Sequence, residues 1–433
     1  MNMLSTIAAP RRQAPPSRVV FINRYFFPDM SATSQILHDL AARLTLAGIE
    51  VHVVCSRQLY QGSKANLPAQ DCIAGIRVHR IRTTNLGRNH LPGRALDYLS
   101  FYCTCAVTLV RLLRSNDVVV AKTDPPLISV VAAVIARLRG ATLVNWLQDI
   151  FPEIATQLGA SPLPGWIDMA LRRVRDSSLR AARANVVLGT QMRDYIAGRR
   201  VPDEQIRIIE NWAGQDETRS IPAQSSQLRG RLGLSDHFVV GYSGNLGRAH
   251  DFRTILDAAA ILAGNPRIVF LMIGGGVNMT LLQEQAASLN LRNMRFLPYQ
   301  PRAALSDSLA AADVHLACLL PQLEGLIVPS KFYGILAAGR PLVFIGKSDG
   351  ELARIIQSAR CGLAVTCGDG RALADALLKF QASPEDLLAM GARARELFLG
   401  TYTAERAATQ WLNLLEELRV EAPSSANRVI RQA

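Results

Sequence analysis

One stretch organises this chain: Glu324-Gly-Leu-Ile-Val-Pro-Ser-Lys-Phe-Tyr-Gly-Ile-Leu-Ala-Ala-Gly-Arg-Pro341. Ser330 stands at the N-cap position of the apolar segment Phe332–Ala338, which we predict to be a helix. Gly339 suits a left-handed exit from that helix, and the proline two residues later prevents its continuation. The apolar run Leu342–Ile345 then predicts a buried strand. The stretch therefore indicates a loop, a helix and a strand of an α/β domain.

Polar side chains gather at the loop-to-helix junction of this stretch. Glu324 supplies a carboxylate, Ser330 a hydroxyl and Lys331 an ammonium. Backbone N–H groups at a helix N-terminus favour anions, and the ammonium adds a full positive charge. We interpret the junction as a seat for a phosphorylated ligand whose polyhydroxyl part lies near Glu324. The alternative is a solvated loop in front of an ordinary packed helix.

Length and composition favour a two-domain protein with reduced cysteines. The 433 residues are enough for two domains of ordinary size, and the hydrophobic content of 49% is enough for sizeable cores. The seven cysteines form no CxxC pair and no metal-binding spacing, which indicates free thiols in a cytosolic compartment. We expect the first 17 residues to be a disordered tail rather than a signal peptide, because they lack an apolar core. We expect no transmembrane helix, because no uninterrupted run of about 18 apolar residues appears.

The excess positive charge lies in the first half of the chain. The formal net charge is +13, and residues 1–212 contain 26 Lys and Arg against 15 Asp and Glu. A basic half-protein indicates an anionic partner, which could be nucleic acid, an acidic membrane surface or a phosphorylated lipid. Few aromatic residues accompany the arginines, and no nucleic-acid motif appears. We therefore favour the membrane or a lipid phosphate, and expect no nucleic-acid partner.

The first half opens with a strand at residues 18–23, a loop at 24–34, a helix at 35–47 and a strand at 50–55. This spacing is typical of a βαβ unit and hence of a parallel sheet. The loop lies at the carboxyl edge of that sheet, where open α/β sheets bind ligands; the alternative is a plain connection. Residues 75–81 predict an edge strand.

A long helix is predicted for Pro92–Arg114. Its apolar face is broad, and arginines flank it. Such a helix could lie on a bilayer. The alternative is a helix packed against the core.

Asp149 follows the predicted strand Ala141–Trp146 closely. It therefore lies at the ligand edge of the sheet. A carboxylate in that place suits the handling of a hydroxyl proton. The alternative is a helix cap.

The second half begins again after the polar stretch 213–226. A strand leads into Gly244 and Asn245, and another leads into Gly274-Gly275-Gly276. Two strand–glycine–helix junctions in one domain favour a phosphate-binding edge more than either alone, although packing constraints explain each as well. Tyr299 follows a third strand and is placed either to stack against a base or to pack.

These motifs resemble those of the bacterial family 4 glycosyltransferases of the GT-B fold. Within that group, the chain is similar to the colanic-acid and O-antigen transferases. The match extends over most of residues 18–418 and is carried by Asn145–Asp149, Tyr242–Gly247, Ile273–Gly276, Phe296–Tyr299, Ala311–Val314 and Glu324–Pro341.

The resemblance implies an α/β protein of GT-B type, in which two Rossmann-like domains face a central cleft. The implied divisions are a disordered tail (1–17), an acceptor-binding domain (18–212), a linker (213–226), a nucleotide-sugar-binding domain (227–400), a helix that crosses back to the first domain (401–418) and a second tail (419–433).

The resemblance also implies a reaction. A sugar would pass from a nucleotide-sugar, most simply a UDP-sugar, to an acceptor with retention of the anomeric configuration, without a cofactor and without a metal ion. The expected acceptor is a saccharide linked to polyprenyl diphosphate, in the synthesis of exopolysaccharide, capsule or O-antigen. The expected location is cytoplasmic and peripheral, at the inner face of the plasma membrane and on its anionic surface.

Residue roles follow from the same resemblance. The implied catalytic residues are Asp149, Arg248, Glu324 and Lys331. The implied donor-binding residues are Gly244, Asn245, Arg248, Gly274, Gly275, Gly276, Tyr299, Ser330 and Lys331. The family's second glutamate, which contacts ribose, is Gly334 here, so Ser330 or Lys331 is expected to substitute for it.

Two other functions remain open at this point. A nucleotide-sugar epimerase of the same fold would need no acceptor and no membrane. A non-catalytic subunit of a polysaccharide assembly complex would bind a nucleotide without turnover.

Overall fold

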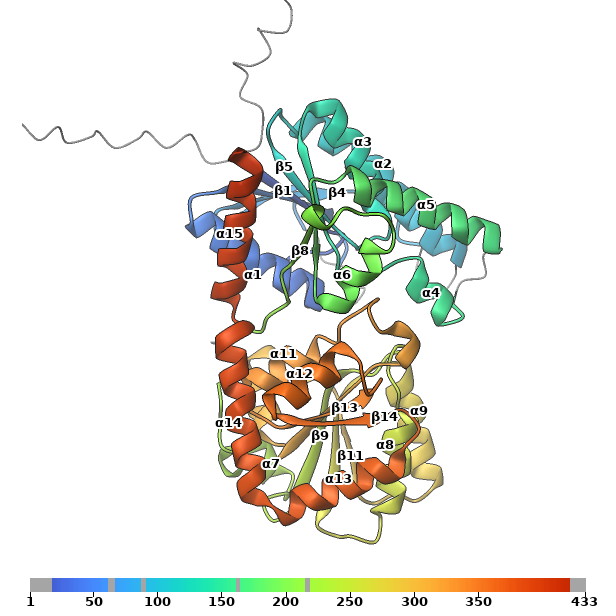
Figure 1. The fold of residues 1–433 in the computed structure, drawn as a ribbon, viewed down its shortest axis with the longest axis vertical. Coiled ribbons are helices and arrows are strands. Elements are labelled where there is room, and N and C mark those ends of the chain that lie inside the picture. Colours follow the sequence, from blue (N-terminus) through green and yellow to red (C-terminus); the bar gives the residue numbers. More distant parts are fainter. Residues whose placement is uncertain (1–17, 61–66, 87–90, 161–163, 215–218, 421–433) are drawn as a thin grey trace, which may run out of the picture.

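The computed structural model describes residues 18–60, 67–86, 91–160, 164–214 and 219–420. These residues form two α/β domains, each built on a mainly parallel sheet that helices cover (Figure 1). The loops that follow the strands of one sheet meet those of the other. The N–H of Ile150 donates to the carbonyl oxygen of Leu326 at 2.9 Å, and Asp149 pairs with Ile327 as an antiparallel bridge. The ligand edges of both sheets therefore lie at the domain boundary.

The N-terminal domain holds an eight-stranded sheet in the order β3-β4-β2-β1-β5-β6-β7-β8. Its strands are β1 (Arg18–Ile22), β2 (Glu50–Ser56), β3 (Gln70–Ile73), β4 (Ile76–Ile81), β5 (Val118–Lys122), β6 (Thr142–Trp146), β7 (Ala184–Val187) and β8 (Ile206–Ile208). Its helices are α1 (Ala32–Leu46), α2 (Leu91–Leu112), α3 (Ile128–Arg139), α4 (Glu153–Gln157), α5 (Gly165–Ala181), α6 (Thr190–Ala197) and the 3-10 turn η1 (Asp203–Gln205). The predicted edge strand at 75–81 is wrong in one respect, because β3 pairs with β4 in antiparallel fashion and takes the edge.

The C-terminal domain holds a six-stranded parallel sheet in the order β11-β10-β9-β12-β13-β14. Its strands are β9 (Phe238–Asn245), β10 (Ile268–Gly275), β11 (Met294–Leu297), β12 (Val314–Cys318), β13 (Leu342–Gly346) and β14 (Gly362–Thr366). Its helices are η2 (Ala223–Ser225), α7 (Gln227–Arg231), α8 (Arg253–Ile261), α9 (Val277–Ser288), η3 (Arg302–Ala304), α10 (Leu305–Ala310), η4 (Pro321–Leu323), α11 (Lys331–Ala337), α12 (Glu351–Ala359), α13 (Gly370–Ala382) and α14 (Pro384–Thr401). The helix and strand predicted around residues 332–345 are confirmed as α11 and β13.

The central strands are apolar on both faces. All five residues of β1, of β5, of β12 and of β13 are buried. Helices cover both faces of a parallel sheet, so its strands have no solvent side and read as continuous apolar runs. The sequence therefore predicts such strands more readily than the half-exposed β3.

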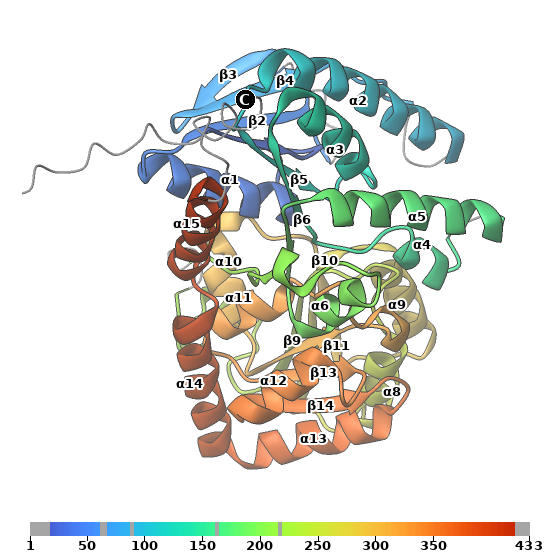
Figure 2. The same ribbon diagram turned by 45° about the horizontal axis from the view of Figure 1, so that its top comes forward.

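The chain returns to the N-terminal domain at its last helix. Helix α14 packs against α11, and α15 (Ala404–Val420) then lies against α1 (Figures 1 and 2). The buried face of α15 joins the core of the first sheet through Trp411, Leu414 and Leu415. Two domains that are sequential in the chain are thus tied together by a segment that follows both.

An aromatic cluster fixes this return. Trp146 and Trp411 are both fully buried, and their ring centroids lie 4.9 Å apart in an edge-to-face arrangement. Phe21 meets each of these rings at 6.4 Å, and Trp212 stacks on Trp146 at 6.1 Å. Edge-to-face pairs add about 0.5–1.5 kcal/mol to the burial of each ring. The C-terminal helix therefore completes the first domain's core.

Helix α2 has one buried and one exposed apolar face. On its inner face, the side chains of Phe101, Cys105 and Leu109 are fully buried in the core of the first domain. A stripe at helical spacing points outward, and its members are Leu96, Leu99, Cys103, Val107 and Val110. Among the described residues, Pro92–Leu112 is the one helix long and apolar enough to cross a membrane, a test that the core helix of a soluble protein also passes. One face of this helix is packed against the core, as one of the two alternatives expected. The other alternative, contact with a bilayer, stays a prediction for the exposed face.

We expect Trp411→Ala to lower the free energy of unfolding by about 3–5 kcal/mol, because it removes the ring that covers Trp146 and leaves a cavity. The matched control is Asn413→Ala, at an exposed position of the same helix, which should change that free energy by less than about 0.5 kcal/mol. Urea denaturation followed by circular dichroism measures both. A Trp411 variant as stable as the control would contradict a core role for α15.

Candidate active site

The C-terminal domain presents two glycine-containing strand ends side by side. Strands β9 and β10 pair to their last residues, with Gly244 opposite Gly274 and Asn245 opposite Gly275. A Cβ atom on Gly274 would lie 2.1 Å from the carbonyl oxygen of Gly244, and its φ of 132° disfavours any other residue. A Cβ atom on Gly276 would lie 2.4 Å from the Asn245 side chain. Close packing of the two strand ends is thus enough to require these glycines.

Tyr299 forms one wall of this edge. Its ring covers Gly275, where a Cβ atom would lie 3.1 Å from the ring. The side chain is 55% exposed. Partial burial of the side chain raises the pKa of its phenol, and the nearby Tyr60 of the other domain adds to that rise. Tyr299 therefore lies at the domain boundary with a free ring face.

Lys331 extends from the first turn of α11 to the same edge. Its Nζ atom donates to the carbonyl oxygen of Asn245 at 2.8 Å and lies 5.0 Å from the centroid of the Tyr242 ring. Gly244 makes room for it, because a Cβ atom there would lie 3.1 Å from Cε of Lys331. Burial lowers the pKa of the ammonium to about 8, so it remains mostly charged at neutral pH.

The loop after β9 carries Arg248, whose side chain is exposed. Asn278 at the start of α9 holds this loop by donating to the carbonyl oxygens of Gly247 and His250 at 3.0 and 2.9 Å. Burial and the Lys331 ammonium lower the pKa of His250 to about 3, so its ring is neutral at physiological pH. Within the described residues, neither Arg248 nor Lys331 forms an ion pair with a carboxylate.

Ser330 and Glu324 do not join this group. Ser330 precedes α11 with helical backbone angles, and its exposed hydroxyl accepts no bond from the helix, so the capping bond suggested by the sequence is absent. Glu324 instead accepts the N–H of Glu351 at 2.7 Å, at the start of α12. Burial raises the pKa of the Glu324 carboxyl, and that N–H opposes the rise. The expected contact of carboxylate, hydroxyl and ammonium is therefore not formed here.

The carboxylate of Glu351, at the start of α12, contacts the N-terminal domain. Glu351 accepts the N–H and the hydroxyl of Thr190 at 2.5 and 3.0 Å, and the N–H of Gln191 at 3.3 Å, at the start of α6. Gly189 leaves room for it, since a Cβ atom there would lie 2.3 Å from the carboxylate oxygens. Glu324 thus caps α12 within the C-terminal domain, and Glu351 caps α6 across the boundary. Both carboxylates lie at helix N-termini, where the helix dipole favours a negative charge.

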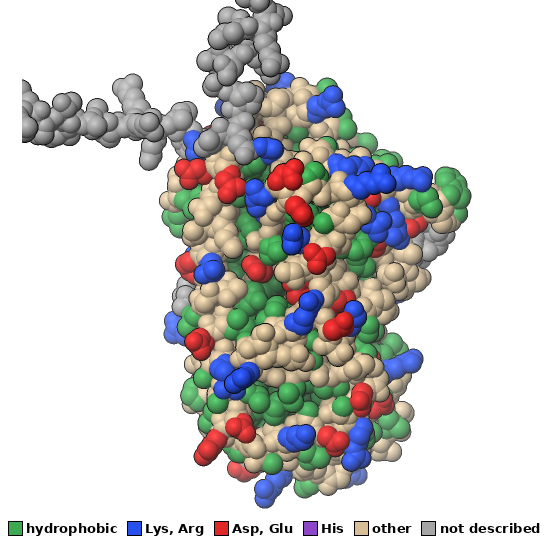
Figure 3. All heavy atoms as spheres, in the orientation of Figure 1, with side chains coloured by type: hydrophobic (Ala, Val, Ile, Leu, Met, Phe, Trp, Pro, Cys, Tyr) green, Lys and Arg blue, Asp and Glu red, His purple; other side chains and the backbone are tan. Residues whose placement is uncertain are grey.

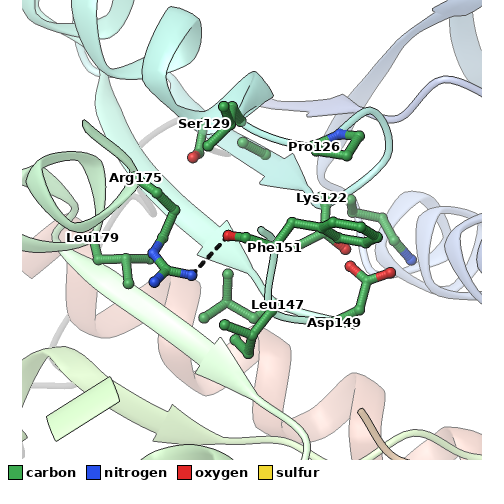
Figure 4. A pocket seen from close by; sticks show the side chains of 12 residues that line it. Lys122, Pro126, Ser129, Leu147, Asp149, Phe151, Arg175 and Leu179 are labelled. Atoms are coloured by element: carbon green, nitrogen blue, oxygen red, sulfur yellow. Dashed lines mark hydrogen bonds between the residues drawn. The ribbon is translucent and has the colours of Figure 1, made fainter. Parts of the chain in front are cut away.

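The N-terminal domain contains a pocket between the ends of β5 and β6 and helices α3 and α5 (Figure 4). Its apolar wall includes Pro126, Leu147 and Leu179, and Asp149 lines one end. Burial raises the pKa of the Asp149 carboxyl to about 6, although a hydrogen bond from Thr123 and the charge of Lys122 oppose the rise. Asp149 is not a helix cap, because its backbone pairs with Ile327 instead of starting a helix.

Arg175 holds another wall of this pocket. It donates to the carbonyl oxygen of Phe151 at 2.8 Å (Figure 4) and to both oxygens of Glu153, at 3.1 and 2.6 Å. The phenol of Tyr195 donates to Glu153 at 2.7 Å. This buried network fixes the loop that carries Asp149.

Lys122 is the residue that the sequence interpretation missed. It ends β5, is 1% exposed and lines the same pocket as Asp149. The signal in the sequence was a lysine directly after Val-Val-Val-Ala, at the carboxyl edge of the sheet. Such a lysine reads as the first solvated residue after a strand.

The described residues contain no group of three or more His, Cys, Asp or Glu side chains arranged to hold a metal ion. The two edges present the cations Arg248, Lys331 and Lys122 and the carboxylates Asp149 and Glu324. Their chemistry suits a phosphorylated, hydroxyl-rich ligand held at the domain boundary.

Two family descriptions match the two domains. Residues 31–212 match "Glycosyl transferase 4-like domain", and residues 225–397 match "Glycosyl transferases group 1". The chain is a two-domain glycosyltransferase. The transferase is 26% identical to "Probable glycosyltransferase WbjE" of Pseudomonas aeruginosa over 73% of this chain and 78% of that protein. It is 26% identical to "Putative colanic acid biosynthesis glycosyl transferase WcaI" of Escherichia coli K12 over 52% of this chain and 56% of that protein.

Solved structures share the fold of this glycosyltransferase. Anabaena Alr3699/HepE in complex with UDP superposes with a TM-score of 0.69 at 16% identity, over 92% of this chain and 100% of that chain. Sucrose-phosphate synthase of Thermosynechococcus elongatus superposes with a TM-score of 0.75 at 18% identity, over 94% and 100% of the two chains. The glycosyltransferase WaaG superposes with a TM-score of 0.64 at 17% identity, over 90% of this chain and 98% of that chain. The predicted GT-B fold is confirmed.

We expect Gly189→Ala to loosen the contact between the glycosyltransferase's domains, because the added Cβ atom would displace the Glu351 carboxylate from α6. The loss of this cap should cost about 1–2 kcal/mol. Small-angle scattering should give a larger radius of gyration. The matched control is Gly165→Ala, where a Cβ atom meets no heavy atom within 4 Å. Adding Gly189→Ala to Glu351→Ala should have no further effect, and an additive effect would contradict the shared mechanism.

Proposed function

We propose that this glycosyltransferase transfers a sugar from a UDP-sugar to a lipid-linked saccharide, with retention of configuration and without a metal ion, in the synthesis of exopolysaccharide, capsule or O-antigen. The observation that carries the proposal is the pair of cations Arg248 and Lys331, at the glycine-lined edge of the C-terminal sheet. Within the described residues, neither cation has a carboxylate partner. A diphosphate would supply the missing negative charge.

The chemistry of the reaction fits this seat. Departure of the nucleoside diphosphate builds negative charge on its phosphate oxygens. The Lys331 ammonium, fixed by Asn245 and the Tyr242 ring, is already in place to stabilise that charge. Arg248 adds a second cation from an adjoining loop. Preorganised charges of this kind cost no rearrangement during the reaction.

The donor and pathway are inferred from similar proteins. HepE was solved with UDP-glucose, WcaI is named for colanic acid biosynthesis, and WaaG is described as involved in lipopolysaccharide biosynthesis. Tyr299 would stack on the base with its free ring face. In this proposal, Asp149 receives the acceptor hydroxyl and Glu324 contacts the donor sugar once that ligand is bound.

A membrane surface would bring the lipid-linked acceptor to the N-terminal domain. Helices α2 and α5 both pack against α3, and both expose apolar side chains. One apolar surface is the exposed stripe of α2, and the other is the start of α5, where Trp166 is 73% exposed. Figure 3 shows Lys and Arg side chains together over the region of α5, beside hydrophobic side chains. Of the basic residues of α5, Arg173 and Arg180 are exposed and Arg172 is half-buried, whereas Arg175 is buried and does not belong to this surface. Apolar and basic side chains on one side suit an anionic bilayer at the inner face of the plasma membrane.

We expect Lys331→Met to weaken the binding of UDP by about 10–100-fold, because a charge-assisted contact to phosphate is lost, and to leave the binding of uridine unchanged. Arg248→Ala should act in the same direction. Calorimetry with UDP, GDP, dTDP, ADP and uridine measures this, and UDP should bind most tightly. Arg371→Ala, on the exposed face of α13, is the matched control. Equal losses for UDP and uridine would remove Lys331 from the phosphate site.

The reaction itself is tested with UDP-sugars and a polyprenyl-diphosphate-linked saccharide. We expect an elongated lipid-linked product, an α-linkage from an α-linked donor, and no loss of activity in EDTA. Mass spectrometry and NMR of the product measure these outcomes. Interconversion of the UDP-sugar without acceptor would instead favour an epimerase, and nucleotide binding without turnover would favour a non-catalytic subunit.

We expect the double variant Leu99→Glu, Val107→Glu to reduce binding to vesicles that contain phosphatidylglycerol by at least about tenfold, because each apolar side chain contributes roughly 1.5–3 kcal/mol when it is fully buried. Flotation and sedimentation assays measure the bound fraction. Leu46→Glu, at an exposed leucine on α1, is the control. Equal binding by both variants, or by vesicles of phosphatidylcholine alone, would contradict membrane contact through α2.

A further inference from the structure

Lys122 is a buried cation that the reaction described so far does not use. Its Nζ atom lies 3.7 Å from the centroid of the Trp146 ring and donates to the carbonyl oxygen of Thr33 at 3.2 Å. An ammonium has three N–H donors. The ring and the carbonyl oxygen occupy two of them, which leaves one N–H that can point into the pocket. Burial lowers the pKa of this ammonium to about 7, against the opposing charges of Asp149 and Asp124.

Asp149 approaches the same space from the neighbouring strand. In the view of Figure 4 the end of the Lys122 side chain lies beside the Asp149 carboxylate, and the charge of each acts on the pKa of the other. Among the described residues, no ion pair within 4.0 Å joins the two side chains, and the buried Oδ1 atom of Asp149 has no hydrogen-bond partner. An unpartnered, buried acceptor beside a cation is costly unless a ligand completes the contact.

The backbone around both groups is fixed. Lys122 and Trp146 are opposite each other at the ends of β5 and β6. Asp149 is held by the bridge to Ile327 of the other domain. Since neither main chain is free to shift, the relation of the two charges is set by the fold.

We propose that Lys122 is a positioning residue for sugar transfer: its ammonium, fixed on the Trp146 ring and the Thr33 carbonyl oxygen, keeps the Asp149 carboxylate ionised and directed at the acceptor hydroxyl. This inference rests on the proposed function. The acceptor oxygen bonds to the anomeric carbon of the donor as the bond from that carbon to the diphosphate oxygen breaks. The hydroxyl proton passes to the Oδ1 atom of Asp149, and the nucleoside diphosphate leaves with the electron pair of the broken bond. Lys122 acts through Asp149 and transfers no proton itself.

The sign of the effect follows from the charges around Asp149. Burial favours its neutral form, and Lys122 and Thr123 favour its ionised form. Without the cation, Asp149 would hold its proton to a higher pH, so the acid limb of kcat/KM should move upward by about one pH unit or more. Lys122→Arg keeps the charge and can stack on Trp146, so it should return the limb toward the wild-type position.

The deciding experiment is a double-mutant cycle of Lys122→Met and Asp149→Asn, with Lys379→Met on the exposed face of α13 as the control. If Lys122 acts through Asp149, Lys122→Met should lower kcat/KM about tenfold on the acid limb near pH 5 in the wild type, and less than about threefold at the same pH in the Asp149→Asn background. UDP binding should be unchanged in every variant. The same fold-loss in both backgrounds, or an acid limb that does not move, would overturn the proposal.

A second measurement does not require turnover. The melting temperatures of the four proteins are compared from pH 5 to pH 9. Two coupled charges should give non-additive shifts near pH 7 that shrink near pH 5, where Asp149 is protonated, and near pH 9, where Lys122 is neutral. Additive shifts at every pH would overturn the charge coupling. If the wild type transfers no sugar, the proposed function fails and the role in the reaction fails with it, while the stability cycle still decides whether Lys122 acts on Asp149.

Discussion

The packing of Trp146 is the constraint on which both the domain arrangement and the N-terminal site depend. Trp411 meets it edge-to-face at 4.9 Å, Trp212 stacks on it at 6.1 Å, and the Lys122 ammonium lies over its ring. A helix that begins at Ala404 therefore supports the ring over which the Lys122 ammonium lies. Since Trp146 also ends β6, the same side chain sets the position from which the chain continues to Asp149.

The stretch from Glu324 to Lys331 links the two edges of the boundary. Its backbone at Leu326 and Ile327 pairs with the loop that carries Asp149. Its carboxylate caps α12, and the Glu351 of that helix caps α6 in the other domain. Its lysine reaches the paired ends of β9 and β10. A displacement of this stretch would thus move Lys331 at the glycine-lined edge of the C-terminal sheet, the loop of Asp149 and the contact between the domains.

Much of the fold could be predicted from the sequence, because it depends on local signals. Apolar runs gave the central strands, and Gly339 followed by Pro341 gave the end of α11. The contacts of the carboxylates were harder to predict. Glu351 looks like the first residue of a helix, and its partner Thr190 is 161 residues away in the sequence. Lys122 was missed for the same reason. Its burial depends on Thr33 and Trp146, and no pattern around a strand-end lysine reports either contact. The glycines at 244, 274 and 276 were identified as significant, and the structure gives strand packing as one sufficient cause.

The return of the chain at α15 has a consequence for synthesis. A ribosome delivers β1 to β8 long before it delivers Trp411, so the nascent N-terminal domain emerges with Trp146 and Trp212 still lacking their cover. Exposed rings of this size are sites where incomplete chains associate. The N-terminal domain therefore does not have its complete core when its own strands have been translated. The core of the first domain is complete only after α15, which follows the whole second domain, has been synthesised.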